Sequence, residues 1–343
     1  MRNRYILLKI KLLLTAFRQK KITFRKLWNV FLCSAAYRLK TKSSGPAPFI
    51  LSLELGNECN ANCLFCRTEK GVIYDINPAK PSTGGIPKGK MPFDMACAIL
   101  NQVKDDVLIA VLYTNGEPLL YKDLSSLIRC ATEHRVLTLV ATNGLLLNKK
   151  NIQEMLEGGL DAIKIQLSGF TQDTYRVQIR YGNVERLKEN IRLLAAMKQA
   201  GGFHTVIMVD YILYAYNRHQ LAEARAFCRD LGVLFNVRPG NPKGGLEDKE
   251  APQSTEELPL KISCDWLWKG MQVNFNGDIL QCCDGVVYSG AKTYATFKIG
   301  VTDVRTVWNG PAARGMRQVI TQKGRGAIPL CAQCYRTGVA FKW

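Results

Sequence analysis

Residues 51–66 read Leu51-Ser-Leu-Glu-Leu-Gly-Asn-Glu-Cys59-Asn-Ala-Asn-Cys63-Leu-Phe-Cys66. An extended apolar run comes first, and three cysteines with the spacing C-x3-C-x2-C follow it directly. Three thiolates can hold one small inorganic centre and leave one metal position open, whereas a structural zinc site is closed by four ligands. The stretch therefore predicts a strand that leads into an iron–sulfur site at Cys59, Cys63 and Cys66. The alternative is three unrelated buried thiols.

With the aromatic Phe65 before its last cysteine, this stretch resembles the signature of the radical S-adenosylmethionine (SAM) superfamily. The resemblance implies a 4Fe–4S cluster whose fourth iron binds the amino and carboxylate groups of SAM. It also implies that one electron from the cluster splits SAM into methionine and a deoxyadenosyl radical, which abstracts hydrogen from a substrate. The cofactors carry this chemistry, and the protein positions and shields them.

Short apolar segments rich in β-branched residues alternate with helical patterns from Pro48 to about Pro239. We expect strands at 49–56, 107–113, 136–141, 162–167, 205–212 and 234–237, and helices at 92–103, 123–133, 149–157, 183–199 and 218–231. This alternation predicts an α/β fold with a parallel sheet and right-handed crossovers. Six such units make a partial (β/α)6 TIM-like barrel, which the resemblance also implies. Functional groups in such folds gather at the carboxyl ends of the strands.

Two of these strand ends resemble SAM-binding motifs of the family. The second strand ends in Asn115-Gly116-Glu117-Pro118, similar to a Gly-Gly-Glu-Pro segment whose backbone meets the SAM amino group. Asn115 replaces the first glycine, and asparagine tolerates a left-handed backbone better than most residues. The third strand ends in Thr142-Asn143-Gly144, which the resemblance places at the SAM pocket.

The fourth strand ends in Ser168-Gly169, where most relatives have Asp-Gly, and Arg180 follows in a segment like the one whose arginine meets the SAM carboxylate. Arginine can bind a carboxylate through two parallel hydrogen bonds. The alternatives are a helix N-cap for Ser168 and a solvated surface charge for Arg180. The cofactor-binding residues that the resemblance implies are Phe65, Asn115, Gly116, Glu117, Pro118, Thr142, Asn143, Ser168 and Arg180.

A second cysteine set follows a stretch at 240–263 that is rich in Pro, Gly and charge and is typical of a linker. The set consists of Cys264, Cys282 and the pair Cys331 and Cys334, with a predicted β-hairpin around Asn276-Gly277. Four thiolates could close either a zinc site or a second iron–sulfur cluster, and the spacing alone leaves both open.

The pattern C-x12-G-x4-C, followed by Val307-Trp308-Asn309 and C-x2-C, resembles the C-terminal extension of the SPASM/twitch branch of the same superfamily. The resemblance implies one auxiliary 4Fe–4S cluster bound by Cys264, Cys282, Cys331 and Cys334. A two-cluster form needs further cysteines, and the sequence has none in the nine residues after Cys334. The expected organisation is a basic segment at 1–48, a barrel at 49–239, a linker at 240–263 and a small cluster-binding hairpin/helix domain at 264–343.

The chain has a formal net charge of +19, and its first 48 residues hold twelve Lys or Arg and no Asp or Glu. Two apolar runs in this segment, 5–17 and 22–32, are shorter than the roughly 20 residues of a spanning helix. They are typical of basic amphipathic helices, which could lie on an anionic membrane or pack on the barrel. Nucleic acid is not expected, because no binding module is present and leucine dominates over stacking aromatics.

Reduced thiols, a labile cluster and the lack of a convincing secretory signal predict a cytoplasmic protein, with residues 1–45 available for peripheral contact with the inner face of the membrane. The predicted function is a radical SAM oxidoreductase that oxidises a sugar-like or lipid-linked substrate by two electrons. A one-electron reductant such as flavodoxin or ferredoxin would drive it. The alternatives are a peptide-modifying maturase that forms thioether or carbon–carbon bonds, and a non-catalytic, metal-binding, membrane-docked protein. None of His134, His204 and His219 lies in an evident catalytic setting, so no general base is assigned.

Overall fold

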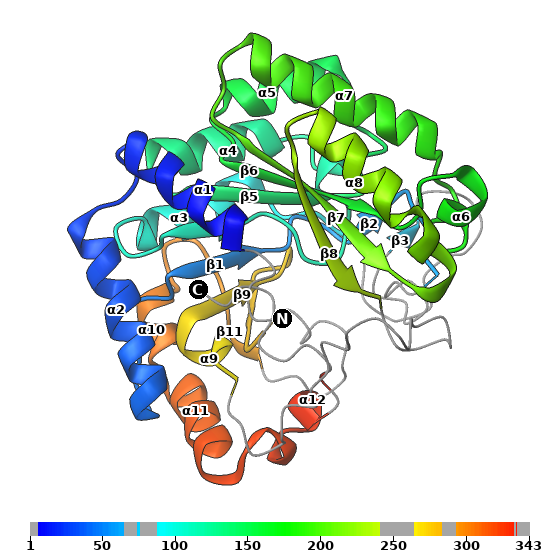
Figure 1. Ribbon diagram of the computed structural model, residues 1–343. Coiled ribbons are helices and arrows are strands. Elements are labelled where there is room, and N and C mark those ends of the chain that lie inside the picture. The colour runs from blue at the N-terminus through cyan, green and yellow to red at the C-terminus, as the bar shows by residue number, and fades with distance from the viewer. Residues whose placement is uncertain are drawn as a thin grey trace.

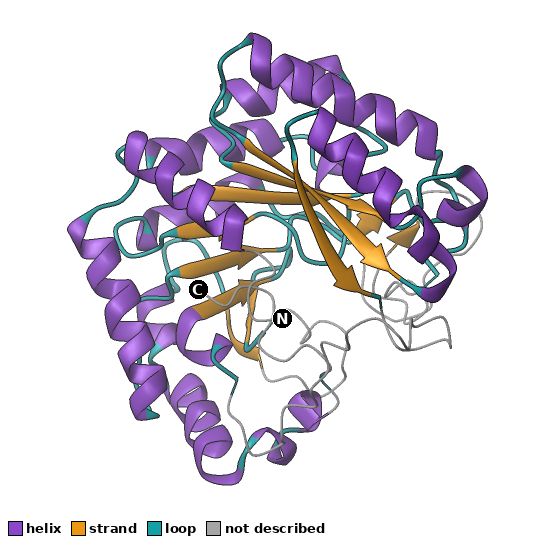
Figure 2. Ribbon diagram, in the orientation of Figure 1, coloured by secondary structure: helices purple, strands orange, loops and turns teal. Residues whose placement is uncertain are grey.

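The computed structural model describes residues 6–64, 88–240, 264–282, 293–332 and 334, together with the backbone of 74–75. Figures 1 and 2 show one strongly curved sheet with helices packed around its outer side. The elements that build the barrel are β1 (Ile50–Leu53), α3 (Phe93–Val103), β4 (Ile109–Val111), α4 (Leu124–Glu133), β5 (Leu137–Thr142), α5 (Lys149–Glu157), β6 (Ala162–Leu167), α6 (Gln172–Arg176), α7 (Val184–Ala200), β7 (Val206–Leu213), α8 (Leu221–Asp230) and β8 (Leu234–Pro239).

The remaining elements lie before the barrel, in its loops and after it. They are α1 (Ile6–Arg18), α2 (Phe24–Leu39), β2 (Glu58–Cys59), β3 (Tyr74–Asp75), η2 (Pro118–Leu120), η3 (Ala215–Gln220), α9 (Trp266–Lys269), β9 (Gly270–Val273), β10 (Asp278–Leu280), β11 (Thr293–Thr296), α10 (Val304–Trp308), α11 (Pro311–Lys323), η4 (Arg325–Ala327) and α12 (Pro329–Ala332).

The main sheet has nine strands in the order β11-β10-β9-β1-β4-β5-β6-β7-β8. Strands β1 and β4 to β8 pair in parallel, in chain order. This confirms the predicted partial α/β barrel, and all six expected strands are present. The helix expected from residue 218 is divided, because the 3-10 helix η3 comes first and α8 begins only at Leu221. Asn217 stabilises that turn, since its side chain accepts from Tyr214 N and donates to Ile212 O.

The C-terminal hairpin extends the barrel sheet. Strands β9 and β10 pair antiparallel around Asn276-Gly277, which confirms the predicted hairpin. Gly277 has φ +89°, and a Cβ there would lie 2.9 Å from Phe297 O, so both backbone and space favour glycine. On its other side β9 pairs in parallel with β1, which lies far away in the sequence. The predicted linker falls mainly at 241–263, outside the described residues.

The two faces of the barrel sheet carry different apolar sets, as the alternation of side chains along a strand requires. Outward-facing residues such as Leu51, Val140 and Ile163 pack under the outer helices. Inward-facing residues at the amino ends of the strands form a second cluster with Leu8, Leu12 and Ala16 of α1. Helix α1 therefore covers the amino-terminal end of the barrel interior, where parallel strands need apolar cover on both faces.

Buried polar contacts attach the N-terminal segment to the barrel. Lys21 Nζ lies 2.7 Å from Asp161 Oδ2, and both side chains are almost fully buried. In α2, Lys26 Nζ donates to Arg135 O, and Asn29 Nδ2 donates to Ala47 O and Asp106 O. The predicted helices are thus present, and one side of each packs on the barrel. Among the residues described, none of the helices is both long enough and apolar enough to cross a bilayer.

The Lys21–Asp161 pair predicts a large stability effect. In Asp161→Asn the Lys21 ammonium stays buried without its counter-charge, and the new amide NH2 faces this buried donor in either orientation, because both carboxylate oxygens accept from Lys21. We expect the free energy of unfolding to fall by about 3–5 kcal/mol, measured by denaturant titration. The control is Asp230→Asn, which breaks an exposed pair with Arg229 and should cost less than about 1 kcal/mol. Equal losses in the two variants would contradict the role given to the buried pair.

Candidate functional site

The first cysteine loop starts at the carboxyl end of β1, as predicted. Cys59 ends the short strand β2 and Cys63 follows it, whereas Phe65 and Cys66 lie outside the described residues. The segment after α6 holds this loop in place. Cys63 forms a β-bridge with Ile179, and Leu64 N donates to Gln178 O at 2.8 Å. These contacts tie the Cys63 end of the loop to the segment after α6.

Glu58 ties residues 88–90 to the same loop. Its carboxylate lies 2.6 Å from Lys88 Nζ and 3.1 Å from Lys90 Nζ. Burial alone would raise the pKa of Glu58, but the two lysines outweigh it and hold the pKa below its usual value. Lys90 Nζ also donates to Leu120 O, and so it connects the cysteine loop to the loop after β4.

The predicted Asn115-Gly116-Glu117-Pro118 segment lies directly against the cysteine loop. A Cβ on Gly116 would stand 2.2 Å from Gly56 O and 2.9 Å from Glu58 O, so only glycine allows this approach. Glu117 N donates to Glu58 O at 2.7 Å. The backbone of Asn115 is not in the left-handed region, and its side chain donates a hydrogen bond to Glu54. The replacement of the first glycine is therefore compatible with the loop.

The Glu117 carboxylate joins two of the predicted SAM-binding segments. It accepts from Thr142 Oγ1 at 2.6 Å and from Asn143 N at 2.9 Å, and also from Leu119 N in η2, which begins at Pro118. Burial raises the pKa of Glu117, and these hydrogen bonds oppose that shift. A fully bonded, buried carboxylate of this kind braces the loops after β4 and β5.

Asn143 extends this network to the cysteines. Its Nδ2 donates to Asn60 Oδ1 at 2.8 Å and lies 3.9 Å from Cys59 Sγ, while its Oδ1 accepts from Leu145 N. Hydrogen bonds to ligand sulfur atoms change the reduction potential of an iron–sulfur cluster. Asn143 therefore stands where it can orient Cys59 and adjust the electronics of a bound cluster.

Two buried hydroxyls remain unsatisfied at the end of β6 and in α6. Ser168 Oγ and Tyr175 Oη have no hydrogen-bond partner within the described residues, although both side chains are 0% exposed. Burial raises the pKa of Tyr175, and the neighbouring Cys63 and Glu117 add to this shift. Thr171, not Ser168, is the N-cap residue of α6. Since buried polar atoms almost always have partners, these hydroxyls fit a polar cofactor beside the first cysteine set.

Arg180 lies at the edge of this site. It follows Ile179, which bridges to Cys63, and its side chain is exposed. Over the part of the chain that the structure describes, its guanidinium forms no hydrogen bond or ion pair with another residue. It is thus near the first cysteine loop and accessible to a carboxylate.

A charged group on the inner wall of the barrel was not predicted from the sequence. Asp210 of β7 accepts from Arg238 Nε at 2.7 Å and from the Asn236 amide, both on β8, and lies 3.9 Å from Lys164 Nζ on β6. Lys164 Nζ also lies 3.1 Å from Tyr113 Oη. Burial alone would raise the pKa of Asp210, but Arg238 and Lys164 outweigh it, so the pKa lies below its usual value. Charged residues at alternate positions of otherwise apolar strands were the available signal.

The second cysteine set gathers where the hairpin, α11 and α12 meet. Cys264 and Cys282 pack against both the inner barrel cluster and a small C-terminal cluster, which Cys331 also contacts. Burial raises the pKa of Cys264, and Asp265, Cys331 and Cys334 add to the effect. Thiols that raise one another's pKa are stabilised as thiolates when a metal centre neutralises them. Across the described ranges, however, no three His, Cys, Asp or Glu side chains already stand in a metal-binding arrangement.

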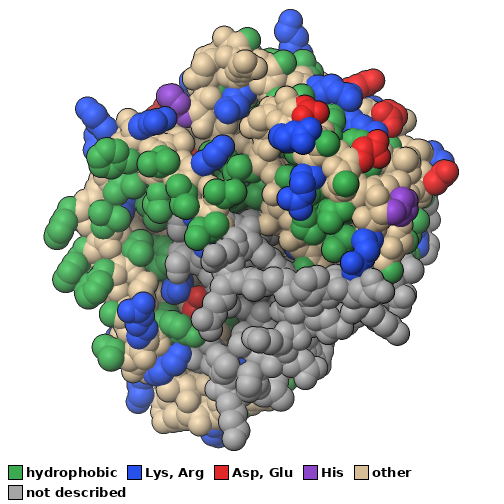
Figure 3. Space-filling view, viewed as in Figure 1, with side chains coloured by type: hydrophobic (Ala, Val, Ile, Leu, Met, Phe, Trp, Pro, Cys, Tyr) green, Lys and Arg blue, Asp and Glu red, His purple; other side chains and the backbone are tan. Residues whose placement is uncertain are grey.

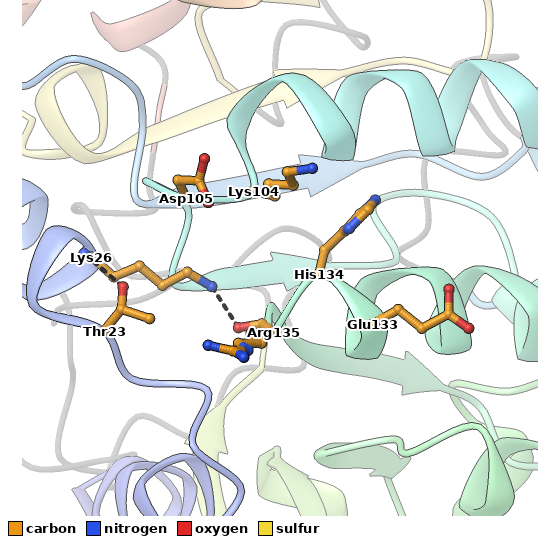
Figure 4. A pocket seen from close by; sticks show the side chains of 7 residues that line it. All are labelled: Thr23, Lys26, Lys104, Asp105, Glu133, His134 and Arg135. Carbon is orange, nitrogen blue, oxygen red and sulfur yellow. Dashed lines mark hydrogen bonds between the residues drawn. The ribbon is translucent and has the colours of Figure 1, made fainter.

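A polar pocket of about 210 Å³ opens elsewhere, beside α2 at the amino-terminal end of the barrel (Figure 4). Burial lowers the pKa of Lys26 to about 8, and the Lys26 ammonium points across the pocket to Arg135 O. None of the predicted site residues lines it, so it is separate from both cysteine sets. Its lining is Thr23, Lys26, Lys104, Asp105, Glu133, His134 and Arg135.

Comparisons with known proteins agree with the two cysteine sets. Residues 53–227 match the family model of the Radical SAM superfamily, and residues 264–335 match that of the SPASM iron–sulfur cluster-binding domain. A probable GTP 3',8-cyclase of Methanocaldococcus jannaschii is 26% identical over 189 residues, which cover 54% of this chain and 57% of that protein. The chain thus matches less than two thirds of the length of this curated relative.

Two solved structures share the fold at low sequence identity. The structure of BtrN in complex with AdoMet and 2-DOIA is 18% identical, with a TM-score of 0.53 over 83% of this chain and 92% of that chain. Streptococcus suis SuiB bound to its precursor peptide SuiA is 16% identical, with a TM-score of 0.61 over 85% of this chain and 71% of that chain. These likenesses concern the fold, a partial barrel with a C-terminal extension.

Proposed function

Because this chain belongs to the radical SAM superfamily, we propose that it is an enzyme that cleaves SAM reductively and oxidises a polar, sugar-like substrate by two electrons. Its matching domains imply a SAM-binding 4Fe–4S cluster and further iron–sulfur ligation in the SPASM part. The proposed ligands are Cys59, Cys63 and Cys66 for the first cluster, and Cys264, Cys282, Cys331 and Cys334 for the auxiliary one.

When bound, these groups would supply hydrogen-atom abstraction from the substrate and an acceptor for the second electron. The chain's own residues would hold the reactants. The backbone of 115–118 would face the SAM amino group, Arg180 would pair with its carboxylate, and the Ser168 hydroxyl would provide a buried hydrogen bond. Asn143 orients Cys59, and Glu117 keeps the two loops in register. A reduced flavodoxin or ferredoxin would provide the first electron.

The substrate class is inferred from the inner wall of the barrel, which is formed by Tyr113, Lys164, Asp210, Asn236 and Arg238. These side chains stand beyond an apolar floor built by α1 and the amino ends of the strands. A wall of paired charges, amides and a phenol offers both donors and acceptors. Such a set can hydrogen-bond hydroxyl and amino groups, and a site built for such bonds discriminates against analogues that lack them.

A peptide substrate is the second candidate. SuiB, which shares the fold, is bound to a precursor peptide, whereas BtrN is in complex with AdoMet and 2-DOIA. A peptide would be modified by a thioether or carbon–carbon bond. The charged, hydrogen-bonding wall favours the sugar-like substrate, since a peptide side chain entering the barrel would meet few apolar contacts beyond the floor.

The test is substrate-dependent cleavage of SAM by the full chain, reconstituted anaerobically and reduced with dithionite. Deuterated polyols, amino sugars and nucleotide sugars are compared with short peptides. We expect a sugar-type compound to stimulate deoxyadenosine formation, to transfer deuterium into it, and to yield a product two hydrogen atoms lighter. Stimulation by peptides alone would replace the proposal with the maturase function. Metal binding without any deoxyadenosine would support a non-catalytic, metal-binding protein.

A further inference from the structure

Helix α2 packs its polar side on the barrel and exposes its apolar side to solvent. Its buried side chains include Lys26, Asn29 and Cys33, which repeat at helical spacing and face the barrel. Its exposed side carries an apolar stripe at positions i, i+3, i+4 and i+7, and Phe24 at the start of the stripe is 82% exposed. An ordinary surface helix has the opposite arrangement, with its apolar stripe against the core. The members of the exposed stripe are Phe24, Leu27, Trp28 and Phe31.

The aromatic members of this stripe form a continuous row. The rings of Phe24 and Trp28 stack at 6.4 Å with planes 9° apart, and those of Trp28 and Phe31 stack at 5.2 Å. Mutual stacking fixes large rings on the surface without burying them. Aromatic rings in this position are typical of the boundary between water and lipid.

Helix α1 adds to the same surface. It buries Leu8, Leu12, Thr15 and Ala16 on the barrel, yet the rest of its circumference is also largely apolar. Of the sixteen large apolar side chains exposed in the described residues, eleven lie on α1 and α2. Figure 3 shows these hydrophobic side chains gathered over the two helices, with Lys and Arg around them. We call this the α1–α2 surface; it comprises Ile6, Leu7, Ile10, Leu13, Leu14, Phe17, Phe24, Leu27, Trp28, Phe31 and Leu39.

The charges of the segment divide into two groups. Lys21, Lys26 and Arg25 bond to the barrel, through Asp161, Arg135 O and Asp106 respectively. Other cations are exposed beside the apolar residues, and the first 48 residues contain no acidic side chain to offset them. The inward contacts make the surface a fixed part of the fold, and the outward cations complement an anionic partner. The exposed cations are Lys11, Arg18, Lys20, Arg38 and Lys42.

We propose that the α1–α2 surface docks the protein on an anionic lipid bilayer, with the Phe24–Trp28–Phe31 row at the interface and the exposed cations on the headgroups. An apolar surface rimmed by cations, on two helices that contain no acidic residue, fits this partner better than a second copy of the chain, whose cations would repel the first set. Docking requires no spanning helix.

The position of the surface has a consequence for the substrate. The α1–α2 surface lies at the amino ends of the strands, whereas the cysteine loop and Ser168 lie at their carboxyl ends (Figure 1). Docking therefore places the enzyme at the membrane without pointing its SAM site into the lipid. The inference is independent of the reaction proposed above.

The test is flotation of the reconstituted full chain with vesicles of phosphatidylcholine alone, or of phosphatidylcholine mixed with an equal part of phosphatidylglycerol. We expect binding to the anionic vesicles, and weaker binding as salt rises. Phe24→Ser, Trp28→Ser and Phe31→Ser together should weaken binding on the order of a hundredfold, because three exposed rings no longer leave water. Lys11→Gln and Arg18→Gln should each weaken it about fivefold.

The matched control is Ile299→Ser with Val301→Ser, two exposed apolar residues outside this surface. It should bind vesicles as the wild type does. Circular dichroism and unchanged deoxyadenosine formation would show that the triple variant is folded. The proposal would be overturned by a wild type that stays off anionic vesicles, by equal losses in the control, or by a dimer that the triple variant converts to monomers.

Discussion

Cys63→Ala should abolish reductive SAM cleavage. In the proposed site three thiolates hold the first cluster and the fourth iron is left for SAM, so losing one thiolate would remove the cluster or its redox function. Changes in the outer shell of metal sites commonly cost 10–100-fold, so the loss of a direct ligand should exceed about a hundredfold. The backbone of Cys63 is also held in place by its bridge to Ile179. The measurement is dithionite-driven deoxyadenosine formation.

Cys97→Ala is the matched control for this experiment. Cys97 packs against the outer core on α3, away from both cysteine sets, and its thiol lies beside Cys130. Its replacement should leave both the iron content and deoxyadenosine formation close to those of the wild type. Deoxyadenosine production by Cys63→Ala at the wild-type rate would remove the basis for a SAM-binding cluster at this loop.

Cys331→Ser should separate the two proposed clusters. We expect the iron content of the reconstituted chain to fall from about eight to about four atoms, because only the auxiliary cluster loses a ligand. SAM cleavage should persist, since Cys59 and Cys63 lie in a different loop, while turnover of substrate should be lost with the second electron acceptor. Iron and zinc analysis on the same sample measures the change.

Two outcomes would argue against this assignment. Zinc in the wild type, lost in Cys331→Ser, would make the second set a structural zinc site and leave the chain without an auxiliary electron acceptor. An unchanged iron content would show that Cys331 is not a ligand. Cys130→Ser serves as control, because Cys130 packs against the outer core.

Local patterns were sufficient for the elements of the barrel. Strands such as Ala162–Leu167 and helices such as Lys149–Glu157 begin and end where the apolar periodicity and the flanking Gly and Asn residues predict. The hairpin at Asn276-Gly277 was predictable for the same reason, because its turn geometry depends on two adjacent residues. The loop positions of both cysteine sets follow from these elements.

Contacts between distant segments were not predictable. No local signal indicates that β9 pairs with β1, or that a Cβ on Gly116 would meet Gly56 O. The inner wall of Lys164, Asp210 and Arg238 depends on the register of three parallel strands, which one residue of slip would turn outward. The role of Glu117 as a brace between loops was likewise visible only once Thr142 and Asn143 lay beside it.

The amino-acid sequence by itself determined the chemistry class, because ligand type and spacing are properties of a short stretch such as 59–66. It also determined the alternation of strands and helices, since side-chain periodicity is local. Only the tertiary structure decided which side of α2 faces the barrel. Composition predicts an amphipathic helix there, but the buried contacts of Lys26 and Asn29 turn its polar side inward and leave the Phe24–Trp28–Phe31 row in solvent. Whether a side chain is buried depends on its contacts with the whole chain, so a local pattern does not determine which side of a helix faces the core.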